Sequence, residues 1–299
     1  MRRAVVVIAT LAIPVAVVVA LAFGLAACGD DGGAEPSPTG TGTVTASPTV
    51  SPTPSASPTG TMTVSVYLLR GETLGVAHRK VPATQAVATA AMTALLEGPS
   101  AREKAAGLAT TIPAGTALNE VTIEDGTARV DLSGEFASGG GSLSMQARVA
   151  QVVYTLTQFP TVKSVEFLVD GEIVTAIGGE GIVVDGPQRR SDWAGLLPAI
   201  FVETPAVGDV VTGSPIKVRG SASVFEATFV LEVLGSGGAT GTGKTVTATE
   251  GAPGRGVFSV SLALPAMTGR GKLVAYEVSM ADGSRMNEVR IPLRFAVAD

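Results

Sequence analysis

The 299-residue chain contains one cysteine and one histidine, and this scarcity limits the chemistry that it could perform. Zinc sites need several Cys, His or carboxylate ligands, and haem and iron–sulfur groups also depend on His or Cys. We therefore expect no metal and no cofactor. The histidine, His78, stands beside Arg79 and Lys80. No nucleophile is placed with it, which favours a solvated loop histidine over a catalytic base.

A second pattern with chemical meaning is Gly-Ala-Thr-Gly-Thr-Gly-Lys-Thr at 238–245, a full match to the phosphate-binding motif GxxxxGK(S/T). That chemistry needs a helix directly after Lys244 and Thr245, so that backbone N–H groups meet the phosphates. The next residues, 246–249, instead alternate as in a strand. We expect a hairpin loop here, and no nucleotide partner.

Two pairs of carboxylates are close in sequence, Asp131 with Glu135 and Glu166 with Asp170. A hydrolase that uses two carboxylates needs them to face each other across a cleft. Asp170 precedes a glycine as in a turn, so a structural role is expected for it, and Glu166 alternates with apolar neighbours, so solvent exposure is expected for Glu166. We predict no catalytic residue and no enzyme activity; a cell-wall hydrolase is the weakest alternative.

Arg189, Arg190 and Trp193 form an unusual polar group with Asp192 between two apolar regions. An exposed tryptophan beside arginines is typical of a partner contact, and this group is the candidate contact site. The alternative is that Trp193 packs the two folded regions together, and we favour that interpretation.

The N-terminal residues predict export. Two arginines precede an uncharged apolar run from Ala4 to Ala27, and the run ends in Leu-Ala-Ala-Cys at 25–28. This order resembles the bacterial lipobox, in which the cysteine thiol receives a diacylglycerol and becomes the new N-terminus. We expect a signal peptide at 1–27 and lipid attachment at Cys28. Because the apolar run is long enough to span a bilayer, an uncleaved anchor is the alternative, and both place the protein outside the cytoplasm.

Residues 28–60 are predicted to be a disordered linker. They are almost wholly Gly, Ser, Thr, Pro, Ala and Asp, with Ser-Pro-Thr repeated at 37–39, 47–49 and 51–53. Such a composition cannot bury enough apolar surface to offset the entropy of folding. The net charge of −5 argues against nucleic acid, which binds through clustered Lys and Arg.

Residues 61–185 predict an α+β domain of order β-α-β-β-α-β-β with both helices on one sheet. Apolar periodicity indicates helices from Thr84 to Gly98 and around 145–156, and Ser100 to Glu103 matches a capping box. Asp-Gly pairs at 125–126 and 170–171 indicate two hairpins, the second extending to Ile177. The remaining expected strands are 63–69, 118–124, 127–132 and 164–169.

Several motifs of this region, in order, resemble the GerMN domain of bacterial sporulation and germination proteins, which also occurs in envelope lipoproteins. They are Leu-Leu-Glu-Gly-Pro-Ser at 95–100, Thr-Ile-Pro-Ala-Gly-Thr at 111–116, Val-Asp-Leu-Ser at 130–133, Gln-Val-Val-Tyr-Thr-Leu-Thr at 151–157 and Val-Glu-Phe-Leu-Val-Asp-Gly at 165–171. The resemblance implies a binding or assembly module of the envelope with a fold like that of ring-building modules.

After a polar linker at 186–198, the residues 199–299 predict an antiparallel β-sandwich. Seven β-prone runs recur, at 200–203, 216–221, 228–234, 244–249, 256–262, 272–279 and 288–296. The segments Ile-Phe-Val-Glu-Thr-Pro at 200–205 and Ser-Pro-Ile-Lys-Val-Arg-Gly at 214–220 resemble the immunoglobulin-like domain of bacterial spore germination. The disulfide of antibody domains is absent, so apolar packing alone must form this core.

These features together predict a membrane-anchored, extracytoplasmic lipoprotein that binds a protein partner or a cell-wall component without catalysis. The alternative is a structural role in which GerMN domains assemble side by side into a ring.

Overall fold

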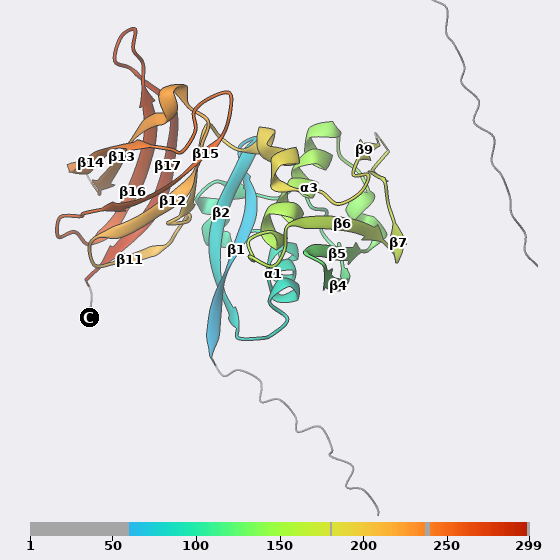
Figure 1. Ribbon diagram of the computed structural model, residues 1–299. Helices are drawn as coiled ribbons and strands as arrows, with labels where there is room; N and C mark the ends of the chain where they lie inside the picture. The colour runs from blue at the N-terminus through green and yellow to red at the C-terminus, as the bar shows by residue number, and fades with distance from the viewer. Residues whose placement is uncertain (1–59, 180, 237–239, 298–299) are drawn as a thin grey trace, which may run out of the picture. The chain divides into compact units, whose positions relative to one another are not determined.

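The computed structural model describes residues 60–179, 181–236 and 240–297. The expected signal peptide, Cys28 and all of the expected linker except Gly60 lie outside the described residues. The described residues belong to one packed unit, and none of their helices is long and apolar enough to cross a bilayer. Figure 1 shows an α+β half, coloured blue to yellow, and an all-β half in orange and red, which confirms the predicted fold class.

The α+β half contains two main sheets rather than the single sheet that we predicted. The first has the order β2-β1-β3, from β1 (Thr61–Arg70), β2 (Thr73–Pro82) and β3 (Leu108–Ala109). We did not predict β2, because His78, Arg79 and Lys80 interrupt its apolar pattern. The structure pairs it with β1 along its whole length in an antiparallel hairpin.

The second sheet has the order β4-β5-β6-β7. Its strands are β4 (Leu118–Glu124), β5 (Thr127–Leu132), β6 (Ser164–Val169) and β7 (Glu172–Ile173). Both predicted Asp-Gly turns are present, with φ of 48° at Asp125 and 50° at Asp170. The second hairpin is shorter than expected, because β8 (Ala176–Ile177) leaves the sheet to pair with β9 (Ile182–Val183).

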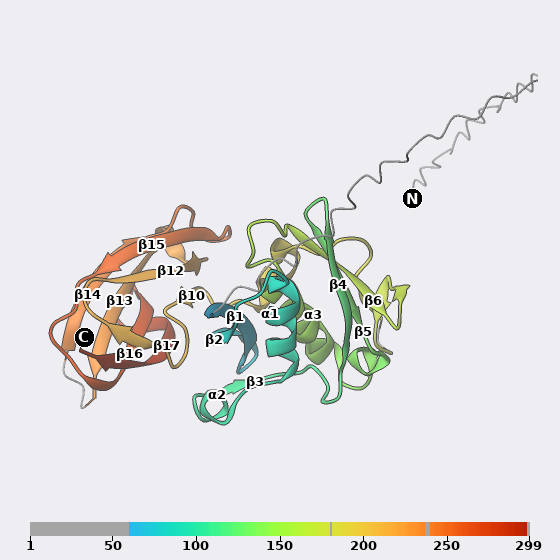
Figure 2. The same ribbon diagram turned by 90° about the horizontal axis from the view of Figure 1, so that it is seen from below.

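Helices α1 and α3 lie between these two sheets (Figure 2). Helix α1 (Val87–Leu96) contacts β1 and β4, and α3 (Ser142–Leu156) contacts β1 and β6. Every residue from Ala147 to Leu156 is buried, as expected for a helix covered on both sides. The short α2 (Ala101–Ala105) has the predicted capping box of Ser100 and Glu103.

The all-β half is a two-sheet sandwich. One sheet has the order β10-β12-β15 and the other β11-β17-β16-β13-β14. All seven expected strands are present, and β11 is an additional strand that pairs in parallel with β17. The strands are β10 (Ile200–Thr204), β11 (Val210–Thr212), β12 (Ile216–Ala222), β13 (Thr228–Gly235), β14 (Thr240–Thr247), β15 (Gly256–Leu262), β16 (Gly269–Val278) and β17 (Arg285–Ala296).

An aromatic pair joins the two sheets in the core of the sandwich. Phe229 of β13 and Phe258 of β15 come from different sheets, and their ring centroids lie 4.9 Å apart in an edge-to-face arrangement. Gly220 of β12 lies beside this pair, where a Cβ atom would come within 1.9 Å of the carbonyl oxygen of Phe201. Only glycine therefore fits at that position.

The fully buried Gln151 joins α3 to both the first sheet and the loop after β3. Its Nε2 donates to the carbonyl oxygen of Tyr67 and its Oε1 accepts from the backbone N–H of Thr111, each at 3.2 Å. Replacing Gln151 with Leu removes the partner of both backbone groups, and the carbonyl of Tyr67 lies in a buried residue. We expect the free energy of unfolding to fall by about 2 to 4 kcal/mol in chemical denaturation.

The matched control is Gln146→Leu, on the same helix. Gln146 is only half-buried, so its replacement should change the free energy of unfolding by no more than about 0.5 kcal/mol. Equal effects of the two substitutions would show that the Gln151 amide does not hold the layers together.

Candidate functional site

The segment that follows the second sheet carries the chain from the α+β half to the sandwich. Gln188 forms an antiparallel bridge with Val165 of β6, and the 3₁₀ helix η2 (Arg190–Leu196) then packs on α3. Strand β10 begins four residues after this helix, at Ile200. The predicted contact group at 189–193 therefore lies at the joint between the two halves.

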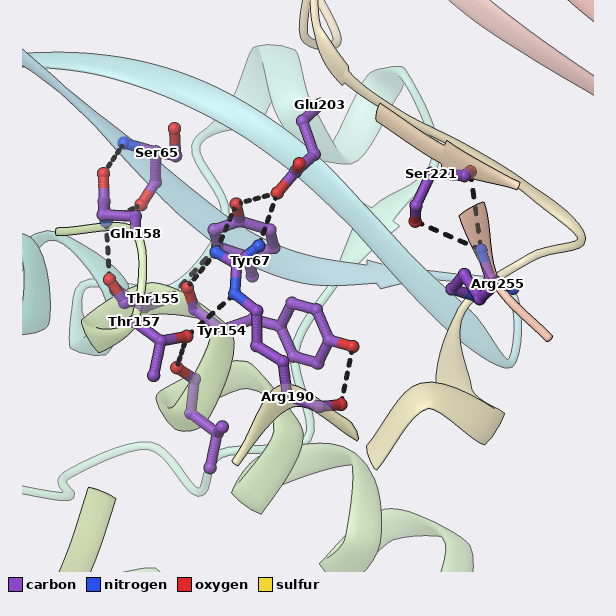
Figure 3. Close-up of polar contacts among 11 residues, drawn as sticks. Ser65, Tyr67, Tyr154, Thr155, Thr157, Gln158, Arg190, Glu203, Ser221 and Arg255 are labelled. Atoms are coloured by element: carbon purple, nitrogen blue, oxygen red, sulfur yellow. Dashed lines mark hydrogen bonds and ion pairs between the residues drawn. The ribbon is translucent and has the colours of Figure 1, made fainter. Parts of the chain in front are cut away.

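Arg190 is the centre of this joint (Figure 3). Its guanidinium donates to Glu203 of β10 at 2.9 Å and to the Tyr67 hydroxyl of β1 at 3.0 Å. The same group donates to the Tyr154 carbonyl at the end of α3, at 3.1 Å, and to Thr157 Oγ1, at 2.8 Å. One side chain thus connects the first sheet, the buried helix and the sandwich.

Aromatic rings surround the guanidinium. Its Cζ lies 4.8 Å from the ring centroid of Tyr154 and 5.2 Å from that of Tyr67, within the range of a cation–π interaction. Phe201 of β10 completes the cluster, with its ring centroid 6.2 Å from that of Tyr67 and 6.3 Å from that of Tyr154. Both tyrosines are buried.

The protonation of these groups follows from their positions. Burial, and then the charge of Glu203, raises the pKa of Tyr67 far above its ordinary value, so its hydroxyl stays protonated and donates to Glu203. Burial raises the pKa of Tyr154 to about 12. Although burial lowers the pKa of Arg190, the interactions with Tyr67 and Glu203 raise it by more. Arg190 therefore keeps its positive charge and forms an ion pair with Glu203.

A second contact across the joint corrects our expectation for His78. This residue lies on β2 rather than in a loop, and its side chain is only 20% exposed. Its Nδ1 lies 2.8 Å from Asp209 Oδ2 in the sandwich half, and the same oxygen accepts the backbone N–H of Ala206. Close by, the N–H of Val207 donates to the carbonyl oxygen of Val76 at 3.0 Å.

The three candidate contact residues have different environments. Arg190 is engaged in the joint, as described above. Trp193 is 9% exposed and belongs to the core, which agrees with the favoured interpretation that it packs inside the protein. Its indole N–H has no hydrogen-bond partner among the described residues. Arg189 is exposed, and its backbone N–H donates to Asp192 at 2.7 Å. A partner contact through Arg189 stays a prediction.

The other candidate patterns take part in local structure. Residues 240–245 of the GxxxxGK(S/T) pattern lie on β14, antiparallel to β13, so the expectation of a loop is wrong for them; the predicted strand is present but begins earlier, and β14 offers no helix N-terminus for a phosphate. Residues 238 and 239 of that pattern lie outside the described residues. Asp131 accepts the N–H of Gly171 at 3.0 Å, Asp170 accepts that of Gly134 at 3.2 Å, and Glu166 pairs with Arg129 at 2.7 Å. Within the described ranges, no group of three metal-ligating side chains occurs.

Arg79 is an important residue that the sequence analysis missed. Its guanidinium binds Glu103 through two nitrogens, at 3.1 and 2.6 Å, and it also donates to the carbonyl oxygens of Ala94 and Gly98. Burial would raise the pKa of the Glu103 carboxyl, but hydrogen bonds from Arg79 and Ser100 lower it by more. The capping box at Ser100 predicted that Glu103 caps the short helix. No local pattern, however, indicates that Glu103 also binds Arg79, which lies on the strand β2 that we did not predict.

Replacing Arg190 with Met should weaken the joint. The substitution leaves Glu203 and Tyr67 without their cationic partner, and we expect the free energy of unfolding to fall by about 2 to 3 kcal/mol in urea denaturation. Arg189→Met, at the exposed neighbour, is the matched control and should stay within about 0.5 kcal/mol of the unaltered protein. If both variants lose the same stability, the contacts of Arg190 do not hold the halves together.

Stability should also fall at alkaline pH. The unfolded chain releases the Tyr154 proton near the ordinary pKa of 10.0, whereas the folded protein retains it to about 12. Between these values the unfolded state binds fewer protons, so the free energy of unfolding decreases as the pH rises. Denaturation at a series of pH values should show a shallower decrease for Tyr154→Phe. An identical decrease in the two proteins would contradict the assignment.

Two regions of the sequence are similar to known protein families. Residues 65–175 match the family described as "Sporulation and spore germination", and residues 199–284 match the "Immunoglobulin-like domain of bacterial spore germination". Spore germination protein GerM of Bacillus subtilis (strain 168) is 28% identical over 139 residues, which are 46% of this chain and 36% of that protein. The match thus spans about a third of that relative's length.

Two solved structures from the same organism are also similar. The tandem GerMN domains of the sporulation protein GerM are 18% identical, with 68% of this chain and 62% of that chain covered and a TM-score of 0.39. The first GerMN domain of the same protein is 26% identical, with 44% and 99% covered and a TM-score of 0.36. On these two matches, residues 65–175 form a GerMN domain of the sporulation and spore germination family, and residues 199–284 form an immunoglobulin-like domain of bacterial spore germination.

Proposed function

We propose that this protein is a lipid-anchored envelope lipoprotein that binds a protein partner or a cell-wall component without catalysis, in a role like that of sporulation and germination proteins. Cys28 would carry the lipid, and residues 28–60 would hold the two domains away from the membrane. The observation that carries the proposal is the Arg190 joint, which connects the GerMN domain to the immunoglobulin-like domain through ionic, aromatic and backbone contacts.

A joint of this kind favours binding. Two domains that are fixed to each other lose little further freedom when a partner contacts them, so less of the interaction free energy is used for ordering. A freely jointed pair would lose that freedom with each binding event. The joint therefore supports a protein that presents a single, preformed surface.

The polar side chains at the joint hydrogen-bond to one another, which supports a role without catalysis. Arg190, Glu203 and Tyr67 hydrogen-bond to one another, and His78 is engaged by Asp209. General acid–base catalysis needs a group that can reach a substrate proton. Each of these groups is instead directed at a neighbouring element of the fold.

Replacing Cys28 with Ser tests the anchor. A serine hydroxyl cannot take the lipid as a thioether, so the variant should lose the acyl mass and leave the membrane fraction. Mass spectrometry and fractionation of cells that produce each form measure both effects. An unmodified Cys28 behind an intact leader in the unaltered protein would contradict the lipoprotein assignment.

The same pair of proteins tests the binding function. A proximity-labelling enzyme fused after Asp299 should mark a restricted set of extracytoplasmic envelope proteins in cells with the unaltered protein, and a different or smaller set in cells with Cys28→Ser. Identical labelling by the two forms would argue against an anchored binding role.

A further inference from the structure

Three strands at or near sheet edges in the described structure have hydrogen-bond partners on their open side. On β1, the side chain of Gln158 bonds both the N–H and the carbonyl oxygen of Ser65, each at 2.8 Å, and Thr155 accepts the N–H of Tyr67. On β15, the carbonyl oxygen of Val257 accepts from the N–H of Thr249 at 3.0 Å. The contact of Val207 with Val76 has the same effect on β2. An exposed strand edge is a template for another strand, and the fold covers these edges.

Strand β4 is different. It is an outer strand of the sheet β4-β5-β6-β7, and Figure 1 shows it at the edge of that sheet, next to β5. Five of its seven residues are exposed. Among the described residues, none apart from those of β5 forms a hydrogen bond with its backbone.

The register identifies the backbone groups that face outward. Glu124 and Thr127 close the two-residue Asp-Gly turn, so Glu124 and then Thr122 exchange hydrogen bonds with β5. The N–H and carbonyl groups of Val121 and Ile123 therefore point away from the sheet. The strand contains neither lysine nor proline, two residues that often protect such an edge, and its register shift lies between Leu118 and Glu120, before Val121 and Ile123.

The two faces of β4 have different chemistry. Val121 and Ile123 pair with Val130 and Ala128, which are buried, so they lie on the face toward the helices. Ile123 is nevertheless 44% exposed, because no strand lies beyond it. The opposite face carries Glu120 and Glu124.

The charge of that face is only partly balanced. Arg129 of β5 lies 3.4 Å from Glu124, but the same guanidinium is closer to Glu166, at 2.7 Å. No described residue forms an ion pair with Glu120. A second copy of β4 would bring further glutamates to the edge, whereas a basic segment would neutralise those already present.

We propose that β4 is a docking edge for an extended peptide segment of a partner protein, which adds to the sheet as a new strand. The segment has apolar side chains beside Val121 and Ile123 and basic side chains beside Glu120 and Glu124. Its main chain supplies the hydrogen bonds, and the alternation of its side chains gives the specificity. This inference rests on the proposed binding function and assigns a surface to it.

The test uses the full chain in detergent and an acetylated, fluorescent octapeptide of alternating lysine and valine. We expect saturable binding, measured by anisotropy, and slower hydrogen exchange in the segment that contains β4. A peptide of alternating glutamate and valine should bind at least about tenfold more weakly, as should the lysine peptide with N-methylated valines. Equal binding of the three peptides would overturn the proposal.

Variants of β4 locate the site. Val121→Pro removes an outward N–H and leaves the hydrogen bonds of Thr122 and Glu124 to β5 in place, so binding should weaken at least about tenfold. Val121→Thr keeps the N–H and is the matched control, with affinity within about threefold of the unaltered protein. Glu120→Lys should also weaken binding. Equal affinity of the proline and threonine variants would overturn the proposal.

Two further results would also overturn it. One is slow exchange of β4 in the protein without peptide, which would show that another part of the chain already covers the edge. The other is protection by the peptide of a different segment only. The N-methylated peptide keeps the test decisive if Val121→Pro does not fold. None of these results affects the lipid at Cys28 or the proximity labelling, so failure of the docking edge is distinguishable from failure of the proposed function.

Discussion

The arrangement of the two halves depends on a partly buried cation. A guanidinium loses hydration when it leaves water, and only close partners can offset that loss. Arg190 has such partners in Glu203, two tyrosine rings and the carbonyl at the end of α3. These groups come from β1, α3 and β10, so no half of the protein can satisfy the charge alone. Domains that share a charge in this way are held in one orientation.

Helix α3 has an equally important role within the GerMN domain. Besides its apolar side chains, it directs Gln151 and Thr155 to the backbone of β1, and Gln158 follows directly after its end. These side chains replace the strand that β1 lacks on that side. Their hydrogen bonds explain why a helix between two sheets carries buried polar residues. Strand β4 differs from β1 in this respect. Its outward-facing backbone groups have no side-chain partners among the described residues.

Local sequence signals predicted the elements whose formation depends on local rules. The two Asp-Gly turns, the capping box at Ser100 and the seven strands of the sandwich all follow from short-range patterns, and all are present. Strand β2 was missed because its polar residues are stabilised by distant partners. His78 pairs with Asp209, and Arg79 pairs with Glu103. A periodicity argument that considers only neighbours interprets such residues as a loop.

The sequence predicted only part of the joint, again because its side chains contact residues that are distant in sequence. The sequence drew attention to 189–193 because Arg and Trp are unusual between two apolar regions, but it could not tell which side chains point inward. In the structure, Trp193 and most of Arg190 are covered, and Arg189 is exposed. Adjacent arginines thus have opposite environments, set by whether a carboxylate and two aromatic rings from other elements lie within reach. The partners that determine this difference are distant in sequence, so local sequence patterns do not show which of the two arginines they will contact.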